Sequence, residues 1–475
     1  MNDACIKSVG NTRTWPMVFK SSSMLKLVQQ ISIILPHIAL IKVAIAICND
    51  PEVIALEEEL KFPISLLPSK ALETLYNESS WFYLSWPLIE KLLPWMKPKC
   101  AKIKRRSQNE GEISCESYWD SADKPYEAKV RFPLCILSSK RWEKLILKKA
   151  ANCSIAKNLQ KQLVDVVRYL FSEIEKWKQD HDPIVSSYAR IPSIFHWKSC
   201  GTIDWLKTAK TLIRDESIHI ANRFILACYY CLGDEIERLW STMKDYEKQC
   251  FAEISSSVIA KIWTSWIARG DSLNYNRIAY GYPDSPLGVR GFFTKLTPTK
   301  KQEWLTSAVR FRTLQYDDLC YCLSCIDENV KEKLFEACSR QILEYFLEWP
   351  MQPFFLQMAA SLWKYLDEKE FQYLLDVIVY QRILVGWCGF NYIELLREFW
   401  NQSTAVCKEY VMMSSFYPSL KIIIDYDYKK PFPKKELVQS NEQDYLFFTS
   451  LGIRFMYFIG KFQHLTEDNE INDIL

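Results

Sequence analysis

Glycine is scarce in this sequence, and its scarcity argues against a sheet-rich fold. Only 12 of the 475 residues are glycine, and four of these lie between Gly270 and Gly291. Tight hairpin turns and β-bulges rely on glycine because it adopts a positive φ without strain. Leucine, isoleucine, lysine and glutamate are instead frequent, in long stretches with helical periodicity. We therefore expect an all-α protein.

Signatures of catalysis and of cofactor binding are also lacking. The sequence contains no GxxxxGKS/T, GxGxxG, GxSxG or HExxH motif and no kinase signature. Acidic pairs such as Asp317-Asp318 stand at expected helix starts, where capping and the helix dipole account for them, although a catalytic carboxylate pair is the alternative. The histidines are too far apart to share one helical turn: His37, His181, His196, His219 and His464. We expect no catalytic residue, no enzyme activity and no cofactor.

Neither sign of charge dominates the chain. Lysine and arginine number 60, aspartate and glutamate number 57, and the net charge is +3. This balance gives no field over the whole molecule that would attract nucleic acid or a membrane. The apolar stretch Met24–Cys48 is interrupted by Gln29, Gln30, Pro36 and Lys42, so it falls short of the roughly 20 apolar residues of a transmembrane helix. We expect two buried helices broken at Pro36, and no membrane partner.

The 16 cysteines are scattered and mostly fall within apolar stripes. The first 23 residues are polar and lack the architecture of a secretory signal. Cysteines in such a chain are typical of reduced core residues. We therefore expect an intracellular protein located in the cytoplasm. A nuclear location is the alternative, because the basic run Lys97–Arg106 has the composition of an import signal.

The best-formed stretch, Asp204–Met243, predicts three short helices. The first begins near Asp204, and Asp234 with Glu237 gives a capping-box start to the third. Gly233 stands where the end of the second helix would tolerate a positive φ. The predicted buried stripe of the third helix consists of Ile236, Leu239, Trp240 and Met243. Helices this short are unstable alone, so each must bury its stripe against its neighbours.

Two later stretches repeat this pattern in weaker form. Glu303–Ala308 is similar to Asp204–Ala209, and Arg382–Trp400 is similar to Arg223–Trp240. The spacings between copies are unequal, which argues against a regular ankyrin or tetratricopeptide array. We expect an irregular, α-solenoid-like array of antiparallel helix pairs. The alternative is that any two amphipathic helices look alike.

Short segments carry a resemblance to a group of proteins. Cys200–Trp205 and Arg223–Trp240, with weaker support from Ile45–Val53, resemble all-helical arthropod proteins with degenerate ankyrin- or HEAT-like helix pairs. The resemblance implies stacked helix pairs and implies no activity. The T-P-L-H start of an ankyrin repeat is absent, so a regular ankyrin stack is not expected.

Composition shifts divide the chain into six parts. They are a flexible tail at 1–23, an N-terminal helical unit at 24–96, a charged linker at 97–130, a middle helical-repeat unit at 131–269, a long Gly/Pro loop at 270–298 and a C-terminal helical-repeat unit at 299–475. Within these parts, Trp81–Trp95 and Asp444–Phe462 predict helices. Lys421–Tyr428 shows β-like alternation instead.

Four cysteines form the sharpest pattern that could hold a metal. Cys228, Cys231, Cys322 and Cys325 make two CxxC units, which together can bind zinc as four thiolates. Both units lie inside helical apolar stripes, whereas structural zinc sites usually place CxxC in tight glycine-containing turns. Core packing is therefore the expected role of these cysteines, and zinc is the alternative. A redox role lacks the surrounding βαβ pattern.

These observations favour a non-catalytic scaffold that binds a protein partner through stacked helices. Two alternatives stay open. One is an enzyme of another helical class with its site near 270–298, because long loops often carry function. The other is nucleic-acid binding through Lys97–Arg106, although a solvated linker is the simpler interpretation of that basic run.

Overall fold

The computed structural model describes most of the chain from residue 38 to residue 458. The described ranges are 38–60, 82–84, 132–153, 155–185, 194–254, 257–281, 287–387, 389–440, 445–450 and 453–458. Most of these residues are helical, which confirms the prediction of an all-α class. The predicted tail at 1–23 and the linker at 97–130, with its basic run, lie outside the described residues.

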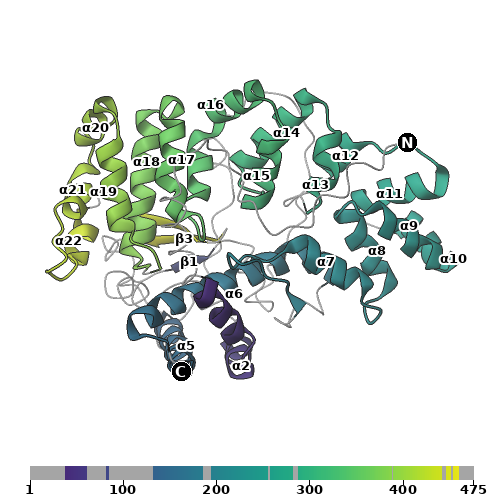
Figure 1. Cartoon of the computed structure of the whole chain (residues 1–475), viewed down its shortest axis with the longest axis horizontal. Coiled ribbons are helices and arrows are strands. Elements are labelled where there is room, and N and C mark those ends of the chain that lie inside the picture. Colours follow the sequence, from purple (N-terminus) through teal and green to yellow (C-terminus); the bar gives the residue numbers. More distant parts are fainter. Residues whose placement is uncertain are drawn as a thin grey trace, which may run out of the picture.

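Helix α6 (Lys157–Val185) organises the molecule. It has 29 residues, so it extends over roughly 44 Å, and it runs below the arc of later helices and above α2 and α5 (Figure 1). Helical periodicity in the sequence predicts a helix over 159–177, and the structure extends this helix to Val185. Its apolar stripe is buried as the helical period requires: Leu163, Val166, Val167, Leu170, Phe171 and Ile174.

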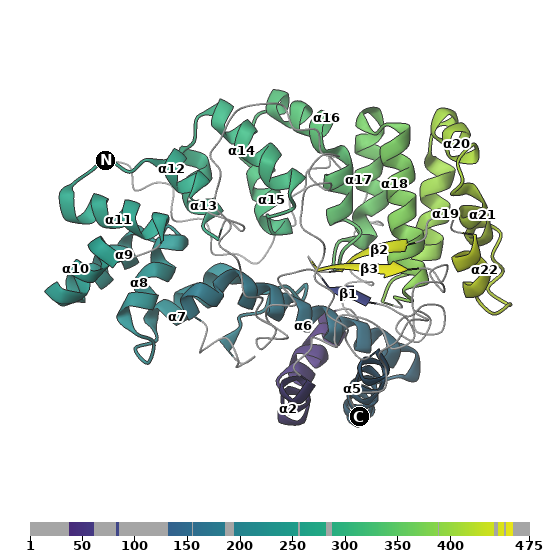
Figure 2. The ribbon, with the colours of Figure 1, turned by 180° about the vertical axis from the view of Figure 1, so that it is seen from behind.

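Three helices from the N-terminal half pack below α6 in both views (Figures 1 and 2). They are the helix at 38–48, α2 (Pro51–Leu60) and α5 (Phe132–Asn152). Lys149 on α5 forms ion pairs with Asp50 at 2.8 Å and with Glu52 at 2.6 Å, which attach the start of α2 to α5. No helix in the described part of the chain is both long and apolar enough to cross a membrane.

The remaining helices follow one another around an arc that leads away from one end of α6 and returns above its other end (Figures 1 and 2). They are α7 (Trp205–Arg214), α8 (Ile220–Tyr229), α9 (Gly233–Thr242), α10 (Asp245–Ile254), α11 (Val258–Arg269), α12 (Tyr275–Tyr280), α13 (Val289–Phe292), η3 (Phe293–Lys295), α14 (Pro298–Arg310), α15 (Tyr316–Ser324), α16 (Glu328–Tyr345), η4 (Gln352–Phe354), α17 (Phe355–Leu362), η5 (Trp363–Tyr365), α18 (Glu368–Ile378), η6 (Val379–Leu384), α19 (Tyr392–Gln402), α20 (Ala405–Met412), α21 (Tyr417–Ile424) and α22 (Lys434–Gln439). Helices that are neighbours in sequence are mostly neighbours in space, as helix pairs require.

Helix starts follow local side-chain chemistry at some predicted positions and depart from it at one. Asp204 accepts a hydrogen bond from the Lys207 amide at 3.0 Å, and the Asn391 side chain caps α19. Helix α9 instead begins at Gly233 without a side-chain cap, so the capping box predicted at Asp234 is wrong. The positive φ falls on Cys231, at 52°, because the turn between α8 and α9 closes two residues earlier than predicted.

The solenoid-like part of the fold prediction is not confirmed. In a solenoid each repeat contacts only its neighbours. Here the Tyr169 ring on α6 stacks between Trp349 and Trp387, with ring centroids 5.3 and 5.2 Å away. These partners lie about 200 residues further along the chain. The helices of the arc are therefore held by α6 as well as by one another.

A small antiparallel sheet is added to the helices. It consists of β1 (Phe82–Leu84), β2 (Tyr445–Ser450) and β3 (Ile453–Phe458), in the order β1-β3-β2. The helices predicted over 81–95 and 444–462 are therefore wrong where the chain is described. Both segments are rich in aromatic residues, which favour strands once a partner strand is available. The β-like alternation at 421–428 is wrong in the other direction, because 421–424 belong to α21.

Candidate functional site

The four cysteines of the possible zinc pattern do not come together. Cys228 is buried in the last turn of α8 and Cys322 is buried in α15, while Cys231 and Cys325 lie in the turns that follow these helices. Desolvation raises the pKa of the Cys228 and Cys322 thiols, which disfavours the thiolate form. Among the described residues, no group of three or more His, Cys, Asp or Glu side chains could hold a metal ion.

The segment 270–298 is folded in its described parts, where the sequence predicts one long loop. It contains α12, α13 and η3, and it buries Ile278, Phe292 and Phe293. Gly291 allows α13 to approach the turn after α8, because a Cβ at this position would lie 2.4 Å from the Cβ of Cys231. Close packing therefore explains Gly291, whereas Gly270 ends α11 in the left-handed conformation with a φ of 72°.

An ionic cluster joins this segment to α15 and to the chain before α7. The Arg290 Nε donates to the Asp318 carboxylate at 2.8 Å, and its guanidinium lies 5.4 Å from the Tyr321 ring centroid. Lys198 forms an ion pair with Asp317. Burial raises the pKa of Asp318, and the nearby Arg290 opposes this rise. Each carboxylate of the predicted acidic pair is thus matched with a cation.

His181 is the histidine of the described chain with the most enclosed environment. Its Nδ1 lies 2.6 Å from the Trp177 carbonyl oxygen, so Nδ1–H donates there and Nε2 accepts from the Tyr230 hydroxyl at 2.8 Å. Burial lowers the pKa of His181 to about 3. His181 and Tyr230 would form a reactive pair in an open site, but both are buried. This hydrogen bond links α6 to the end of α8.

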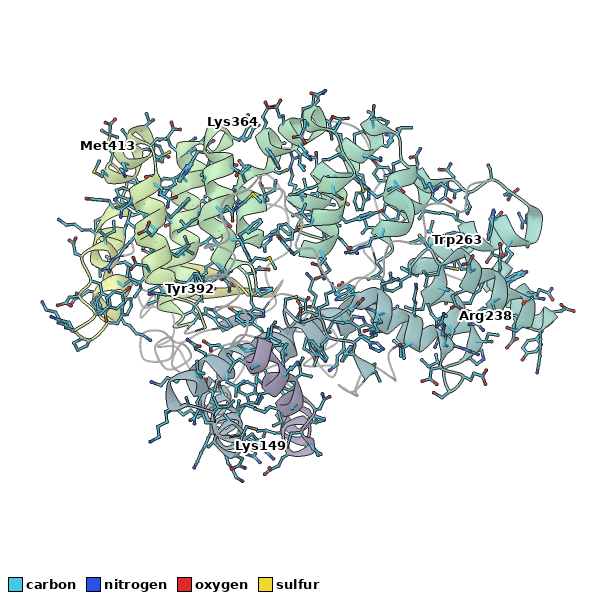
Figure 3. The ribbon with its side chains drawn as sticks, in the orientation of Figure 1. Lys149, Arg238, Trp263, Lys364, Tyr392 and Met413 are labelled. Carbon is cyan, nitrogen blue, oxygen red and sulfur yellow. The ribbon has the colours of Figure 1, made fainter. Side chains whose placement is uncertain are left out.

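A buried polar network surrounds the π-helical turn η6, and single π turns frequently mark functional positions. Arg382 Nε and the Tyr392 hydroxyl both donate to the Leu347 carbonyl, at 3.1 and 3.3 Å. Gln352 Nε2 donates to the Tyr392 hydroxyl at 3.0 Å. Tyr392 lies where α19 begins, inside the helical layer (Figure 3). The network holds the chain that leads from α16 to α17 against η6 and α19.

The other side of η6 carries a chain of hydroxyl groups. The Tyr380 hydroxyl donates to Ser419 at 2.7 Å, and the Ser419 and Ser440 hydroxyls lie 2.6 Å apart. Burial raises the pKa of the neighbouring Asp376 to about 7. A serine, a tyrosine and a carboxyl group of this kind can support proton transfer in an accessible site. Tyr380 and Ser419 are buried, however, so the chain of hydroxyls joins η6 to α21 and α22.

Helix α20 has the opposite character, because it exposes apolar side chains. Val406, Tyr410 and Met413 are 59%, 40% and 88% exposed. Their four- and three-residue spacing places them in one row along the helix surface, which we call the α20 stripe. Cys407 and Val411 form a second, buried row that packs against the molecule. Met413 stands at the outer end of the arc and points away from it (Figure 3).

The α20 stripe is not among the sites predicted from the sequence. The signal was present, because residues 405–413 contain two apolar rows at helical spacing on a helix of only eight residues. One row suffices to pack such a helix against a core. The second row is therefore the feature that points to a binding surface.

Comparisons with known proteins identify no relative. No family model matches the chain, no curated protein matches it, and no solved structure matches it. The function is therefore argued from the geometry of the described residues.

Proposed function

We propose that the protein is a non-catalytic scaffold that binds a helix of another protein along the α20 stripe. The observation that carries the proposal is the row formed by Val406, Tyr410 and Met413, exposed on a helix whose opposite row is already buried. Contiguous exposed apolar side chains on a protein surface commonly mark interaction sites. An intracellular, cytoplasmic setting belongs to the proposal and rests on the many cysteines in the helical stripes.

The spacing of the stripe supports a helix as the bound element. Apolar side chains at positions i, i+4 and i+7 are those with which one helix packs against another. Tyrosine and methionine are enriched in protein interfaces, and methionine adapts its shape to the groups it meets. A partner helix with its own apolar row would cover these three side chains. Nucleic acid or a charged ligand would leave them exposed to water.

The polar clusters support the non-catalytic part of the proposal. The ionic cluster at Arg290 pairs its charges, and the networks at His181 and η6 are enclosed by other side chains. A catalytic site needs a reactive group that a substrate can reach. The α20 stripe offers accessible surface without reactive groups, which suits recognition rather than chemistry.

Quantitative affinity purification of the full chain tests the proposal. The variant Val406→Glu with Met413→Glu places two charges in the stripe, and both positions are exposed, so folding should be retained. Val258→Glu is the matched control, since Val258 on α11 is 48% exposed and lies outside the stripe. Loss of two of the three contacts of the stripe should reduce binding by roughly thirtyfold or more.

The expected result is a defined set of proteins that copurifies with the wild type and with Val258→Glu but not with the double variant. Direct titration of a purified candidate should give the same ranking. Recovery of the same proteins with the double variant would contradict the proposal, as would a wild-type chain that enriches nothing.

A further inference from the structure

A fully buried arginine lies where α2, α5 and α6 meet. The Arg168 NH2 group donates to the Glu143 carboxylate on α5 at 2.6 Å, and the guanidinium lies 4.9 Å from the centroid of the Trp142 ring. A buried guanidinium cannot lose its proton under ordinary conditions, so it needs an anionic partner to remain in the core. Glu143 supplies that partner from α5, and the buried Asp165 on α6 adds a second negative charge near Arg168.

A second carboxyl group reaches the same junction from α2. The Glu57 Oε1 atom is buried, and the indole N–H of Trp142, which is also buried, lies beside this carboxyl group. Burial raises the pKa of Glu57 to about 8, and Glu175 adds to this rise, whereas Lys178, Trp142 and Arg168 oppose it. At neutral pH the Glu57 side chain is therefore mostly uncharged.

We propose that the junction of α2, α5 and α6 is a pH-operated latch in which Glu57 and Glu143 compete for the guanidinium of Arg168. With Glu57 protonated, Arg168 stays with Glu143 and α2 stays packed. An ionised Glu57 is costly in this site unless it gains the guanidinium or moves into water. Either change loosens the second half of α2, while Lys149 still holds its first turn through Asp50 and Glu52.

Each element around Glu57 contributes a group that matters for this competition. The helix at 38–48 contributes the buried thiol of Cys48, whose pKa is raised by burial and further by Glu57. Helix α6 contributes Glu175, which is paired with Lys178 at 2.8 Å and disfavours a second negative charge nearby. The reactivity of Cys48 therefore reports the movement of α2, because this thiol becomes accessible to solvent when α2 moves.

Alkylation of Cys48 by iodoacetamide, followed by mass spectrometry on the intact full-length protein, tests the latch. The rate is measured from pH 6.5 to pH 9.5 and divided by the rate at Cys228, a buried thiol on α8. The ratio removes the common effect of pH on thiol reactivity. Since the ionised fraction of a group with a pKa of about 8 rises about tenfold between pH 7 and pH 9, the ratio should rise about tenfold with a midpoint near pH 8.

Two variants make the assignment specific. Glu57→Gln keeps the shape of the protonated side chain, so its ratio should stay flat across the range. Glu143→Gln removes the competitor for Arg168, so Glu57 should ionise more easily and the midpoint should fall by roughly one to three pH units.

The same rise in Glu57→Gln as in the wild type would overturn the latch, and so would a flat profile in the wild type. An unchanged midpoint in Glu143→Gln would overturn the competition for Arg168. If Glu57→Gln does not fold, the Glu143→Gln midpoint still decides the outcome. The result does not depend on the α20 stripe, because the two features lie on different elements.

Discussion

Polar side chains are usually exposed and apolar side chains buried, and helices α6 and α20 depart from this rule in opposite ways. Helix α6 buries Arg168 and His181, while α20 exposes Val406, Tyr410 and Met413. The buried polar groups of α6 bond to partners on α5 and α8, so they fix how the helices are arranged. The apolar groups of α20 remain available to another molecule. Substitutions on α6 should therefore change stability, and substitutions on the α20 stripe should change binding.

The largest effect is expected at Trp177 on α6. This side chain is fully buried, stacks on His181 at 3.9 Å and meets the edge of Phe195 at 5.1 Å. Trp177→Ala should lower the free energy of unfolding by about 3–5 kcal/mol through lost contacts and a cavity. Trp240→Ala is the control, since Trp240 is only partly buried and should cost clearly less. Chemical denaturation measures both, and equal losses would contradict the central place of α6.

The next effect depends on pH at His181. Its pKa is about 3 in the folded protein against 6.5 in the unfolded chain, so below pH 6.5 the unfolded chain binds a proton that the folded protein excludes. The stability contributed by the neutral imidazole is present above pH 6.5 and is lost as the pH falls toward 3. By pH 5 the loss amounts to about 2 kcal/mol.

His181→Phe keeps an aromatic ring against Trp177 and removes the titrating group. Compared with the wild type, the variant should lose about 2 kcal/mol less between pH 7 and pH 5. Denaturant titrations at the two pH values measure this difference. If the wild type and the variant lose the same free energy of unfolding between pH 7 and pH 5, His181 is not buried in its neutral form.

A smaller effect is expected where α6 meets the far part of the arc. Tyr169→Leu removes the ring that stacks between Trp349 and Trp387, and each such aromatic pair contributes about 0.5–1.5 kcal/mol beyond burial. The expected loss is about 1–3 kcal/mol. Tyr373→Leu on α18 is the control, since Tyr373 is partly exposed and should change stability little. If Tyr169→Leu leaves the free energy of unfolding unchanged, this ring does not hold the far part of the arc against α6.

The ionic cluster should contribute less than either buried contact. Arg290 is about half exposed, so its pair with Asp318 is screened by salt. Arg290→Gln should cost at most about 1 kcal/mol at low salt, and less in 0.5 M sodium chloride. A larger loss that is insensitive to salt would show that this cluster, like the α6 contacts, is structural.

The smallest effect on stability is expected on α20. Val406→Glu with Met413→Glu should leave the free energy of unfolding within about 0.5 kcal/mol of the wild type, because neither side chain packs inside the molecule. Thermal unfolding followed by circular dichroism tests this. A loss of several kcal/mol would mean that the stripe belongs to the core, and the contrast between α6 and α20 would fail.

Local rules predict much of the fold. The buried stripe of α6 follows from the helical period, and the start of α7 follows from the capping side chain of Asp204. The strands β2 and β3 did not, because aromatic segments become strands only when a partner strand lies beside them. The contact of Tyr169 with Trp387 could not be predicted either, since no local sequence pattern links residues so far apart.

The candidate site was harder to predict than the fold. Cys228 and Cys322 belong to CxxC units whose spacing fits a zinc site, yet a spacing shared with an apolar stripe cannot distinguish a metal ligand from a core residue. The run Glu57-Glu58-Glu59 has the composition of a solvated helix face, and the burial of Glu57 depends on how α2 meets α5 and α6. The second apolar row on α20 was visible in the sequence, but its exposure was not.

Hydrogen exchange of the full chain with and without its purified partner distinguishes the α20 stripe from the region of Arg290 as the binding surface. If the stripe binds the partner, exchange should slow over residues 405–413 on binding and stay unchanged over residues 275–281 and 287–292. Protection confined to 275–281 and 287–292, with none over 405–413, would show that the partner binds near Arg290 and not at the stripe.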